Sequence, residues 1–351
     1  MSDADRPHEA PPWQPELPKL GGVIGDAPED FEVEEVPLYA ASGEGGHFYL
    51  WVQKRELNTR DVVRLLAEAG GIDESEVGSA GLKDRNAVTR QWFSVPDSAK
   101  PPDTWQLPAQ AQILEVTRHT NKLRTGHLLG NRFSLRLQGC VPDWEVRWAA
   151  LSQAVERQGV FNYFGPQRFG NHGQNLGRAR FWLKRGARGR GFQPRLYASV
   201  LQSEVFNRYL TSRREAGLER PLAGEIVRLA NTGKHFRIQT VESELERWET
   251  HDILPTGPMT GPKMLQADDQ AGELERSATA ALGLDSLPRP FAKLAPGTRR
   301  DLLLFPEQLR LEADGDALRL SFGLPSGSYA TELVSALTGA EARPTQERES
   351  G

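Results

Sequence analysis

Strand-like runs occupy the two parts of this chain of 351 residues that flank a more helical middle. Period-two alternation of apolar residues predicts strands in the first part, over residues 31–36, 47–54, 77–81, 88–95, 111–118 and 131–138. Beyond Gly173 the sequence pattern predicts helices over 196–216, 240–249 and 268–283, with Gly and Pro clustered at 255–262. Strand-like runs return near 301–322. This order predicts one sheet that is interrupted by an inserted domain and completed by the C-terminal strands.

Turn and cap residues give local predictions in the first part. The loop at 43–46 contains three glycines and predicts that the first two strands form a hairpin. A helix follows, with Asn58 or Thr59 as N-cap, Asp61 in its first turn and Gly70-Gly71 as its stop. A second helix is predicted over 143–158 and ends at Gly159.

Cysteine count and hydropathy narrow the class of protein. The one cysteine, Cys140, excludes a disulfide framework and a Cys-based metal cluster within the chain. The polar, Pro-rich start lacks the apolar core of a signal peptide, and no run approaches eighteen apolar residues. We therefore expect a soluble cytoplasmic protein without a membrane span. A monomer is the default expectation, because no heptad pattern argues for an oligomer, and no obligate protein partner is evident.

The net charge of −4 hides a strongly basic block. Residues 116–203 carry fifteen Lys or Arg against three acids, a local charge of +12. Residues 157–203 contain no carboxylate at all, while nine cations and several aromatic residues alternate there. Cations interleaved with aromatic rings are typical of surfaces that neutralise phosphates and stack bases. A solvated basic face is the plainer interpretation, and a polyanionic partner is the favoured one.

An acidic residue between two cations marks the connection before the strand at 88–95. Asp84 lies between Lys83 and Arg85, after a small-residue strand end at 77–81. Connections held by a rigid scaffold commonly carry reactive groups. The two cations would favour the ionised carboxylate if they lie near it in space, and such a carboxylate is a candidate nucleophile. Taken alone, a solvated turn is the more common meaning of such a triplet.

An aromatic loop follows the second predicted helix. Residues 161–170 read FNYFGPQRFG, and the two glycines and the proline forbid a regular helix over the whole stretch. One interpretation is the wall of a pocket for a flipped base, with an aromatic ring stacked on the base, Asn162 reading its edge and Arg168 holding a phosphate. The other is a hydrophobic loop anchor in which the aromatic rings belong to the core.

Four stretches together resemble the TruD family of tRNA pseudouridine synthases. They are PEDFEVEE at 28–35, AGLKDRNAVTRQ at 80–91, the aromatic run NYFGPQRFG at 162–170, and LPSGSYAT at 324–331. They occur in the order of that family and extend over about residues 20–338. The two central runs are long and specific to the family.

The resemblance implies the fold and the domain organisation. It implies an α/β (α+β) chain with a pseudouridine synthase core, built on a mixed, largely antiparallel sheet, and an inserted α/β TRUD domain. The catalytic domain would comprise 21–182 plus 305–338, and the insertion 183–304. Residues 1–20 and 339–351 would be flexible tails.

The resemblance also implies the activity and the site. The family isomerises a uridine of tRNA, at position 13 in the D arm, without a cofactor or metal. The catalytic aspartate falls on Asp84, and the base-binding positions fall on Phe31, Asn162 and Tyr329. Candidate supporting or RNA-binding residues are Lys83, Arg85, Phe164, Gln167, Arg168, Arg178, Arg180, Lys184 and Arg185.

Two positions depart from the family pattern. Relatives commonly carry Phe where this chain has Tyr329, so a buried hydroxyl here would need a partner. Relatives often carry Lys or Arg where this chain has Gly25. A phosphate contact from that position must be absent or come from another residue, such as Lys19 or Arg55.

The implied chemistry leaves several alternatives open. An ionised Asp84 would attack either the ribose C1′ or the uracil C6, and the base that removes the C5 proton is not assigned. A noncatalytic tRNA-binding or RNA-folding protein is the principal alternative function, and an aspartate-dependent nucleoside hydrolase is a third. The scattered glycines at 186, 189 and 191 form no dinucleotide-binding motif or P-loop.

Overall fold

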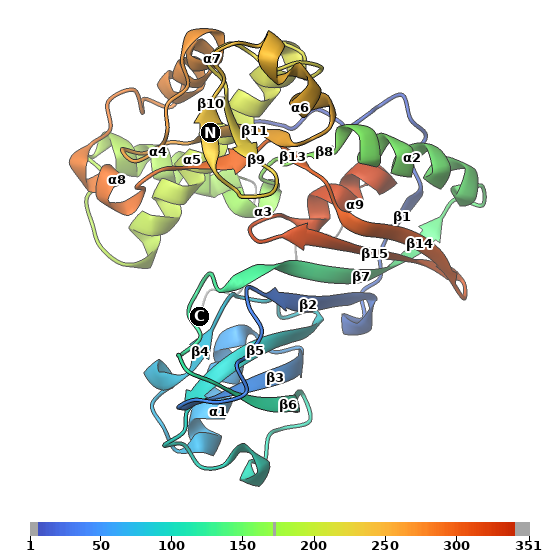
Figure 1. Cartoon of the computed structure of the whole chain (residues 1–351), viewed down its shortest axis with the longest axis vertical. Coiled ribbons are helices and arrows are strands. Elements are labelled where there is room, and N and C mark those ends of the chain that lie inside the picture. The colour runs from blue at the N-terminus through green and yellow to red at the C-terminus, as the bar shows by residue number, and fades with distance from the viewer. Residues whose placement is uncertain (1–5, 171–172, 341–351) are drawn as a thin grey trace.

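A nine-stranded mixed sheet organises the larger part of the molecule (Figure 1). The computed structural model describes residues 6–170 and 173–340. The order of the sheet is β14-β15-β7-β2-β5-β3-β6, with β1 on β7 and β4 on β5. Among these described strands, only β2 and β5 pair in parallel, which agrees with the predicted mixed, largely antiparallel sheet. These strands are β1 Gly21–Ile24, β2 Phe31–Pro37, β3 His47–Arg55, β4 Gly78–Ser79, β5 Val88–Pro96, β6 Ala111–His119, β7 Leu128–Cys140, β14 Glu307–Asp314 and β15 Ala317–Pro325.

The predicted hairpin of the first two strands is wrong, because β5 lies between β2 and β3. The parallel register places Glu32 opposite Val88, and β3 pairs with the other edge of β5 along its whole length. The connection from β2 to β3 is long enough to cross over the intervening strand. Its Gly43 donates a backbone hydrogen bond to Arg118 O on β6, at 3.0 Å, instead of closing a tight turn.

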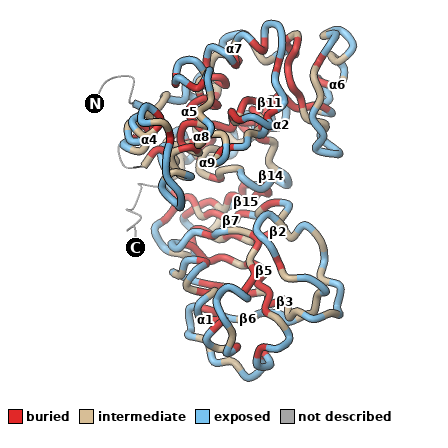
Figure 2. The backbone as a smooth tube through the Cα atoms, turned by 90° about the vertical axis from the view of Figure 1, so that its left-hand side faces the viewer, coloured by how far each residue is buried: buried red, intermediate tan, exposed pale blue. Residues whose placement is uncertain are grey.

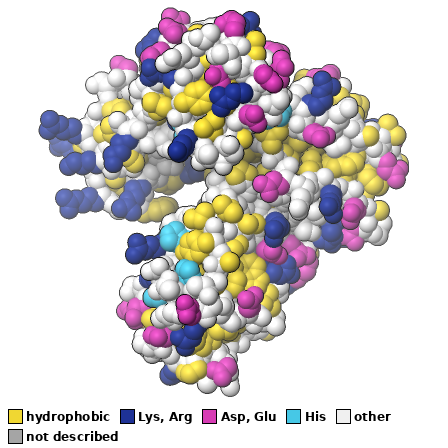
Figure 3. Space-filling view, viewed as in Figure 1, with side chains coloured by type: hydrophobic (Ala, Val, Ile, Leu, Met, Phe, Trp, Pro, Cys, Tyr) yellow, Lys and Arg dark blue, Asp and Glu magenta, His cyan; other side chains and the backbone are white. Residues whose placement is uncertain are grey.

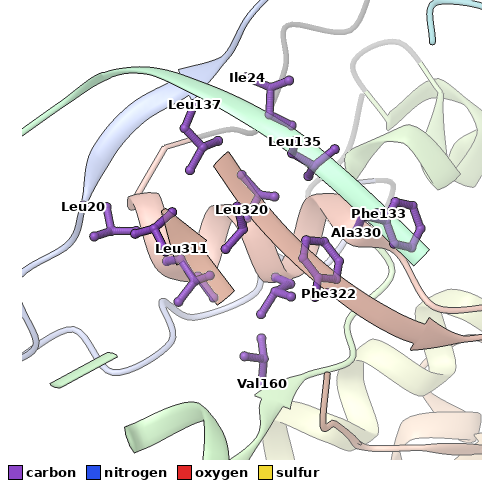
Figure 4. Packing of buried hydrophobic residues seen from close by; sticks show 14 of the residues in the cluster. Leu20, Ile24, Phe133, Leu135, Leu137, Val160, Leu311, Leu320, Phe322 and Ala330 are labelled. Atoms are coloured by element: carbon purple, nitrogen blue, oxygen red, sulfur yellow. The ribbon is translucent and has the colours of Figure 1, made fainter. Parts of the chain in front are cut away.

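One face of this sheet carries two hydrophobic cores, and helices cover both. The first core lies between β15, β7 and β2 and the helices α2 (Trp144–Gln158) and α9 (Ala330–Thr338). Figure 4 shows the part of it where Leu135 of β7, Leu320 of β15 and Ala330 of α9 come together. The second lies between β3, β5 and α1 (Thr59–Gly70). Buried positions follow the alternation of the strands (Figure 2).

Local sequence signals account for α1. The Asn58 side chain accepts a hydrogen bond from Asp61 N at 3.0 Å, and Asp61 Oδ2 accepts one from Asn58 N at 2.9 Å. This reciprocal capping satisfies two backbone donors at the helix start. The helix ends before Gly71, whose φ of 66° lies in the left-handed region. The predicted cap and stop are both confirmed.

The segment between the strands of the large sheet forms a third core around the long helix α5 (Phe192–Glu215). The cluster also includes Phe164, Phe169 and Leu176, which precede the predicted insertion. A four-stranded antiparallel sheet of order β10-β9-β11-β12 lies beside it. The other elements are α3 Pro166–Phe169, α4 Gln174–Lys184, α6 Leu245–Glu249, α7 Asp269–Ala280, α8 Arg289–Leu294, β9 Ile226–Leu229, β10 His235–Arg237, β11 Ile253–Met259, β12 Thr298–Asp301, and the pair β8 Val160–Phe161 with β13 Leu303–Leu304.

Most of the Gly and Pro cluster at 255–262 lies within a strand, because β11 runs through residues 255–259 of it. Pro255 and Pro258 both lie in this strand. The two neighbouring strands each pair with only part of β11, β9 with 253–255 and β12 with 256–259. This divided pairing leaves places in the ladder for residues without an N–H. Burial of the strand then outweighs its poor strand propensity.

The N-terminal segment is packed over residues 13–20, which corrects the expectation of a flexible tail there. Trp13 is 6% exposed, and its indole N–H donates to Gly159 O at 2.9 Å. Leu20 is fully buried and donates its backbone N–H to Leu337 O at 3.0 Å. Burial of two large apolar side chains offsets the loss of chain entropy.

The expected C-terminal tail over 339–351 lies outside the described residues from 341 onward. Among described residues, no helix combines the length and apolar character needed to cross a bilayer.

Candidate active site

The turn that carries Asp84 is anchored to both of its neighbours. It connects β4 with β5, and the Asp84 side chain is exposed. The Lys83 backbone N–H donates to Thr59 Oγ1 at 2.9 Å, which ties the turn to the start of α1. Lys83 Nζ donates to Glu35 Oε2 on β2 at 3.0 Å. The turn is thus fixed on the sheet face, while its carboxylate-bearing residue stays accessible to a substrate.

The two cations that flank Asp84 in sequence have partners of their own. Lys83 and Glu35 form a buried ion pair, with side chains 5% and 0% exposed. Burial raises the pKa of the Glu35 carboxyl, and the Lys83 ammonium opposes that rise. Arg85 is exposed and its Nε donates to Glu56 O at 3.2 Å. Glu35 therefore holds the Lys83 side chain, and Arg85 is held by the backbone of Glu56.

Lys54 of β3 is the cation that holds the Asp84 backbone, and the sequence prediction missed it. Its side chain is fully buried, and Nζ donates to Leu57 O at 2.6 Å and to Asp84 O at 2.7 Å. Burial lowers the pKa of Lys54 to about 8, against the opposing attraction of Asp84. A signal in the sequence existed, because Lys54 lies on the same face of the strand as the core residues Leu50 and Val52, four and two positions away.

Phe31 lies at the same sheet face as the Asp84 turn. It begins β2, parallel to β5, and shares a hydrophobic cluster with Ala87 at the end of the turn. Its ring meets Phe133 edge to face with centroids 6.3 Å apart, and Phe133 in turn stacks on Phe322. Phe31 is 7% exposed. The predicted base-binding ring is thus supported from behind by a row of aromatic rings.

Asn162 is buried, and its amide bonds within the protein. Nδ2 donates to Asp301 O at 2.8 Å, and Oδ1 accepts a hydrogen bond from Arg300. The side chain is 3% exposed. We expected this amide to read the edge of a base, but in this structure it orients the Arg300 guanidinium. Arg300 follows Arg299 in the sequence, and no local pattern indicated that it would reach residue 162.

Arg300 and Arg168 surround an aromatic pair formed by Phe164 and Tyr329. The Arg300 guanidinium lies 4.1 Å from the Phe164 ring centroid and 5.7 Å from that of Tyr329. Burial lowers the pKa of Arg300 to about 10. Arg168 Nη2 lies 2.5 Å from the Tyr329 hydroxyl and Nη1 lies 3.0 Å from Ser199 Oγ. The extra hydroxyl of the half-buried Tyr329 therefore has a hydrogen-bond partner within the protein.

Glu332 is a half-buried carboxyl beside this cluster, at the start of α9. Burial raises its pKa to about 7, and Arg300 opposes the rise. Its carboxylate lies against the backbone of Gly165, where a Cβ would overlap it. Arg300 keeps its charge near neutral pH, whereas Glu332 titrates there. The cluster is consequently net positive and suited to an anion.

The elevated pKa of Glu332 predicts a pH dependence of stability. Between about pH 4.5 and pH 7 the folded chain holds a proton here that the unfolded chain releases, so this contribution is full below pH 4.5 and is lost as pH rises through 7. Relative to Glu332→Gln, the wild type should lose about 3 kcal/mol of unfolding free energy between pH 4.5 and pH 8. Urea denaturation of both proteins measures this difference. Curves that stay parallel across this range would contradict the prediction.

Comparisons with known proteins identify the family. The family model of tRNA pseudouridine synthase D (TruD) matches residues 12–177 and 193–336. The chain belongs to the TruD family. It is 42% identical over 344 residues to "tRNA pseudouridine synthase D" of Anaeromyxobacter dehalogenans strain 2CP-C, covering 95% of this chain and 97% of the relative. It is 40% identical to a Thermus thermophilus protein of the same name, covering 99% of this chain and 98% of that relative.

A solved structure shares the fold of this TruD-family chain. The crystal structure of the putative tRNA pseudouridine synthase D (TruD) from Methanosarcina mazei aligns with a TM-score of 0.74, covering 95% of this chain and 97% of that chain. Its sequence identity is 21%, so this likeness concerns the fold. The resemblance drawn from the four sequence stretches and the predicted α+β fold class are confirmed, and membership of the family makes the chain an isomerase.

The TruD-family departure at Gly25 has a structural counterpart in Asp30. A Cβ at Gly25 would overlap the Asp30 carboxylate, which accepts a hydrogen bond from Ala27 N at 3.1 Å. Lys19 and Arg55, the two residues considered as replacements for a cation at position 25, both bond to other groups of the protein. Lys19 Nζ donates to Trp13 O at 2.6 Å, and Arg55 Nε donates to Glu29 Oε1 at 2.7 Å.

The remaining candidate RNA-binding residues lie on α3, which is part of the aromatic loop, and on or next to α4, which follows it. Gln167 is exposed on α3, and Arg178 is exposed on α4. Arg180 and Lys184 also belong to α4, which Arg185 ends. In the part of the chain that the structure describes, no group of three His, Cys, Asp or Glu side chains is placed to hold a metal ion.

Proposed function

We propose that this chain isomerises a uridine of tRNA to pseudouridine, at position 13 of the D arm, with Asp84 as the nucleophile. One observation carries the proposal. An exposed Asp84 occupies a turn anchored by Lys54, Thr59 and Glu35, on the sheet face that also presents Phe31. Membership of the TruD family supplies the substrate class, and the resemblance of the central sequence runs to that family supplies the position in tRNA.

The isomerisation balances within a single nucleotide. The C1′–N1 bond of the uridine breaks, the base turns, a C1′–C5 bond forms and the C5 proton is released, while N1 gains a proton. The ionised Asp84 carboxylate forms a transient bond to either C1′ or C6, and this bond breaks again before product leaves. Stacking on Phe31 and Tyr329 keeps the loosened base in place for the second bond.

The charges around the Phe164–Tyr329 ring pair support an RNA substrate. Arg168 and Arg300 lie beside the rings of Phe164 and Tyr329, and the nearby Glu332 is only partly ionised at neutral pH. Guanidinium groups beside aromatic faces can hold a phosphate while the ring stacks on a base. We further propose that residues 21–182 with 305–338 form the catalytic domain and that 183–304 form the inserted TRUD domain.

The direct test uses unmodified tRNA transcripts. The protein is incubated with transcripts that carry uridine at position 13, and pseudouridine is located by carbodiimide modification followed by primer extension. We expect one new stop that reports position 13, and its loss with a transcript that carries cytidine there. Absence of pseudouridine from every transcript and from cellular RNA would favour the noncatalytic RNA-binding alternative. Pseudouridine at another position would preserve the activity and refute the site.

The basic surface predicts a steep salt dependence of tRNA binding. Replacing Arg178, Arg180, Lys184 and Arg185 together by Ala should weaken binding and flatten the slope of log K against log salt by about one for each phosphate that the protein no longer neutralises. Filter binding at salt concentrations from about 50 to about 200 mM measures this slope. The exposed Lys234 of the β9–β10 connection serves as control, and Lys234→Ala should leave the slope unchanged. An unchanged slope in the quadruple variant would remove these residues from the interface.

A further inference from the structure

A pocket of about 500 Å³ lies between α4 and the start of α5, apart from the proposed catalytic residues. Its walls are cationic and aromatic, formed by Arg178, Phe181, Trp182, Arg185, Arg188 and Tyr197. It shares no lining residue with the group of Asp84, Phe31 and Tyr329. Figure 3 shows Lys and Arg side chains projecting where Figure 1 places α4 and α8, above a hollow that separates this part from the part with β4.

Hydrogen bonds and ring contacts shape this pocket in the absence of a ligand. The Trp182 indole N–H donates to Arg188 O at 2.8 Å and so fixes the connection between α4 and α5. Trp182 also packs against Tyr197 and Phe291, with ring centroids 6.0 and 6.4 Å away. A buried Ala187, with φ of 55°, anchors the same connection. Such a preformed site loses little conformational entropy when it binds.

One wall of the pocket is an aromatic ring that folding leaves in solvent. Phe181 is 61% exposed, and the Arg185 guanidinium lies 5.5 Å from its ring centroid. A stacked base would cover the part of this ring that lies in solvent. Residues 157–203 contain no carboxylate, so no acid of this segment competes for the arginines. The pocket thus combines a stacking surface with a site for an anion.

We propose that this pocket captures one unpaired nucleotide of the RNA, distinct from the uridine that is isomerised. The base stacks on Phe181 and Trp182, and its phosphate lies among Arg178, Arg185 and Arg188. The volume is within the range of pockets that hold molecules of this size. The inference rests on the proposed RNA substrate and extends it, because it assigns a second recognition point on the same tRNA. Capture of an unpaired base would let the protein distinguish a folded tRNA from a regular duplex.

The test compares two exposed phenylalanines in the full chain. Phe181→Ala removes the stacking wall, and Phe192→Ala is the matched control, because Phe192 is 72% exposed in the same basic segment and does not line the pocket. Binding of unmodified tRNA is measured by fluorescence anisotropy at several salt concentrations. We expect Phe181→Ala to raise Kd about tenfold with an unchanged salt slope, and Phe192→Ala to change it less than about twofold. Thermal unfolding checks that both variants fold.

Abasic substitution identifies the captured nucleotide. Transcripts that lack one base at a time, at each unpaired position, are bound to the wild type and to Phe181→Ala. We expect one position other than 13 whose base loss costs the wild type about tenfold and costs Phe181→Ala almost nothing. A flat scan, or equal effects of Phe181→Ala and Phe192→Ala, would overturn the proposal. If binding weakens with added salt and on removal of the arginines but not with Phe181→Ala, the surface binds phosphate without capturing a base. That result would also overturn the proposal.

These binding results separate the inference from the proposed function. If pseudouridine forms normally and the abasic scan is flat, only the second recognition point fails. If no pseudouridine forms but the Phe181-dependent base effect is present, the pocket stands and the catalytic proposal fails.

Discussion

Replacement of Asp84 by Asn should abolish pseudouridine formation, with kcat lower by on the order of 10³-fold or more. The amide has nearly the same shape as the carboxylate but cannot supply the attacking oxygen anion. The turn should keep its conformation, because Lys54 and Thr59 hold it through its backbone. Single-turnover assays with saturating enzyme measure the chemical step separately from binding.

The same variant should bind tRNA within about threefold of the wild type, because one exposed charge contributes little to affinity. Asp103→Asn provides a matched control, since Asp103 is an exposed carboxylate at the start of a short helical turn in the same sheet-bearing part. Its kcat should equal that of the wild type. Normal turnover by Asp84→Asn would exclude Asp84 as the nucleophile, and an equal loss with Asp103→Asn would point to a general charge effect.

Lys54→Met should lower kcat by about a hundredfold while tRNA binding stays close to that of the wild type. The substitution keeps the apolar stem but removes the donor to Leu57 O and Asp84 O, so the turn can move relative to the substrate. Displacement of a reacting group by about 1 Å can cost 10²-fold in rate. Separate measurement of kcat and of Kd for tRNA distinguishes this positioning role from a role in binding. Lys100→Met, at an exposed lysine, is the control.

The depressed pKa of Lys54 gives an independent readout. Between about pH 8 and pH 10.4 the unfolded chain holds a proton that the folded chain has released, so the contribution of Lys54 to the unfolding free energy rises with pH. The wild type should therefore gain about 3 kcal/mol relative to Lys54→Met over this interval. The neutral amine still has two hydrogens for the two carbonyls. Urea denaturation that shows a constant difference between the two proteins would contradict the buried position of this ammonium.

Much of the secondary structure follows from signals that act between near neighbours. The cap at Asn58, the stop at Gly71 and the alternation of β7 depend on contacts within a few residues, and the prediction of each is confirmed. The hairpin of β2 and β3 was wrong because turn residues do not reveal which strand lies between them. The strand at Ile253–Met259 was missed because burial overrode the local preference of its glycine and prolines.

The candidate site divides in the same way. By itself, the sequence determined that the chain carries Asp84 on a connection, aromatic residues in a loop and a carboxylate-free basic segment, because these are properties of composition and order. Only the tertiary structure decided which cation meets which acceptor. Lys54 donates to the Asp84 carbonyl, Lys83 forms an ion pair with Glu35, and Arg300 donates to the Asn162 side chain. Many cations compete for each acceptor. Strand register and burial select among them, and both arise from contacts between residues far apart in the sequence.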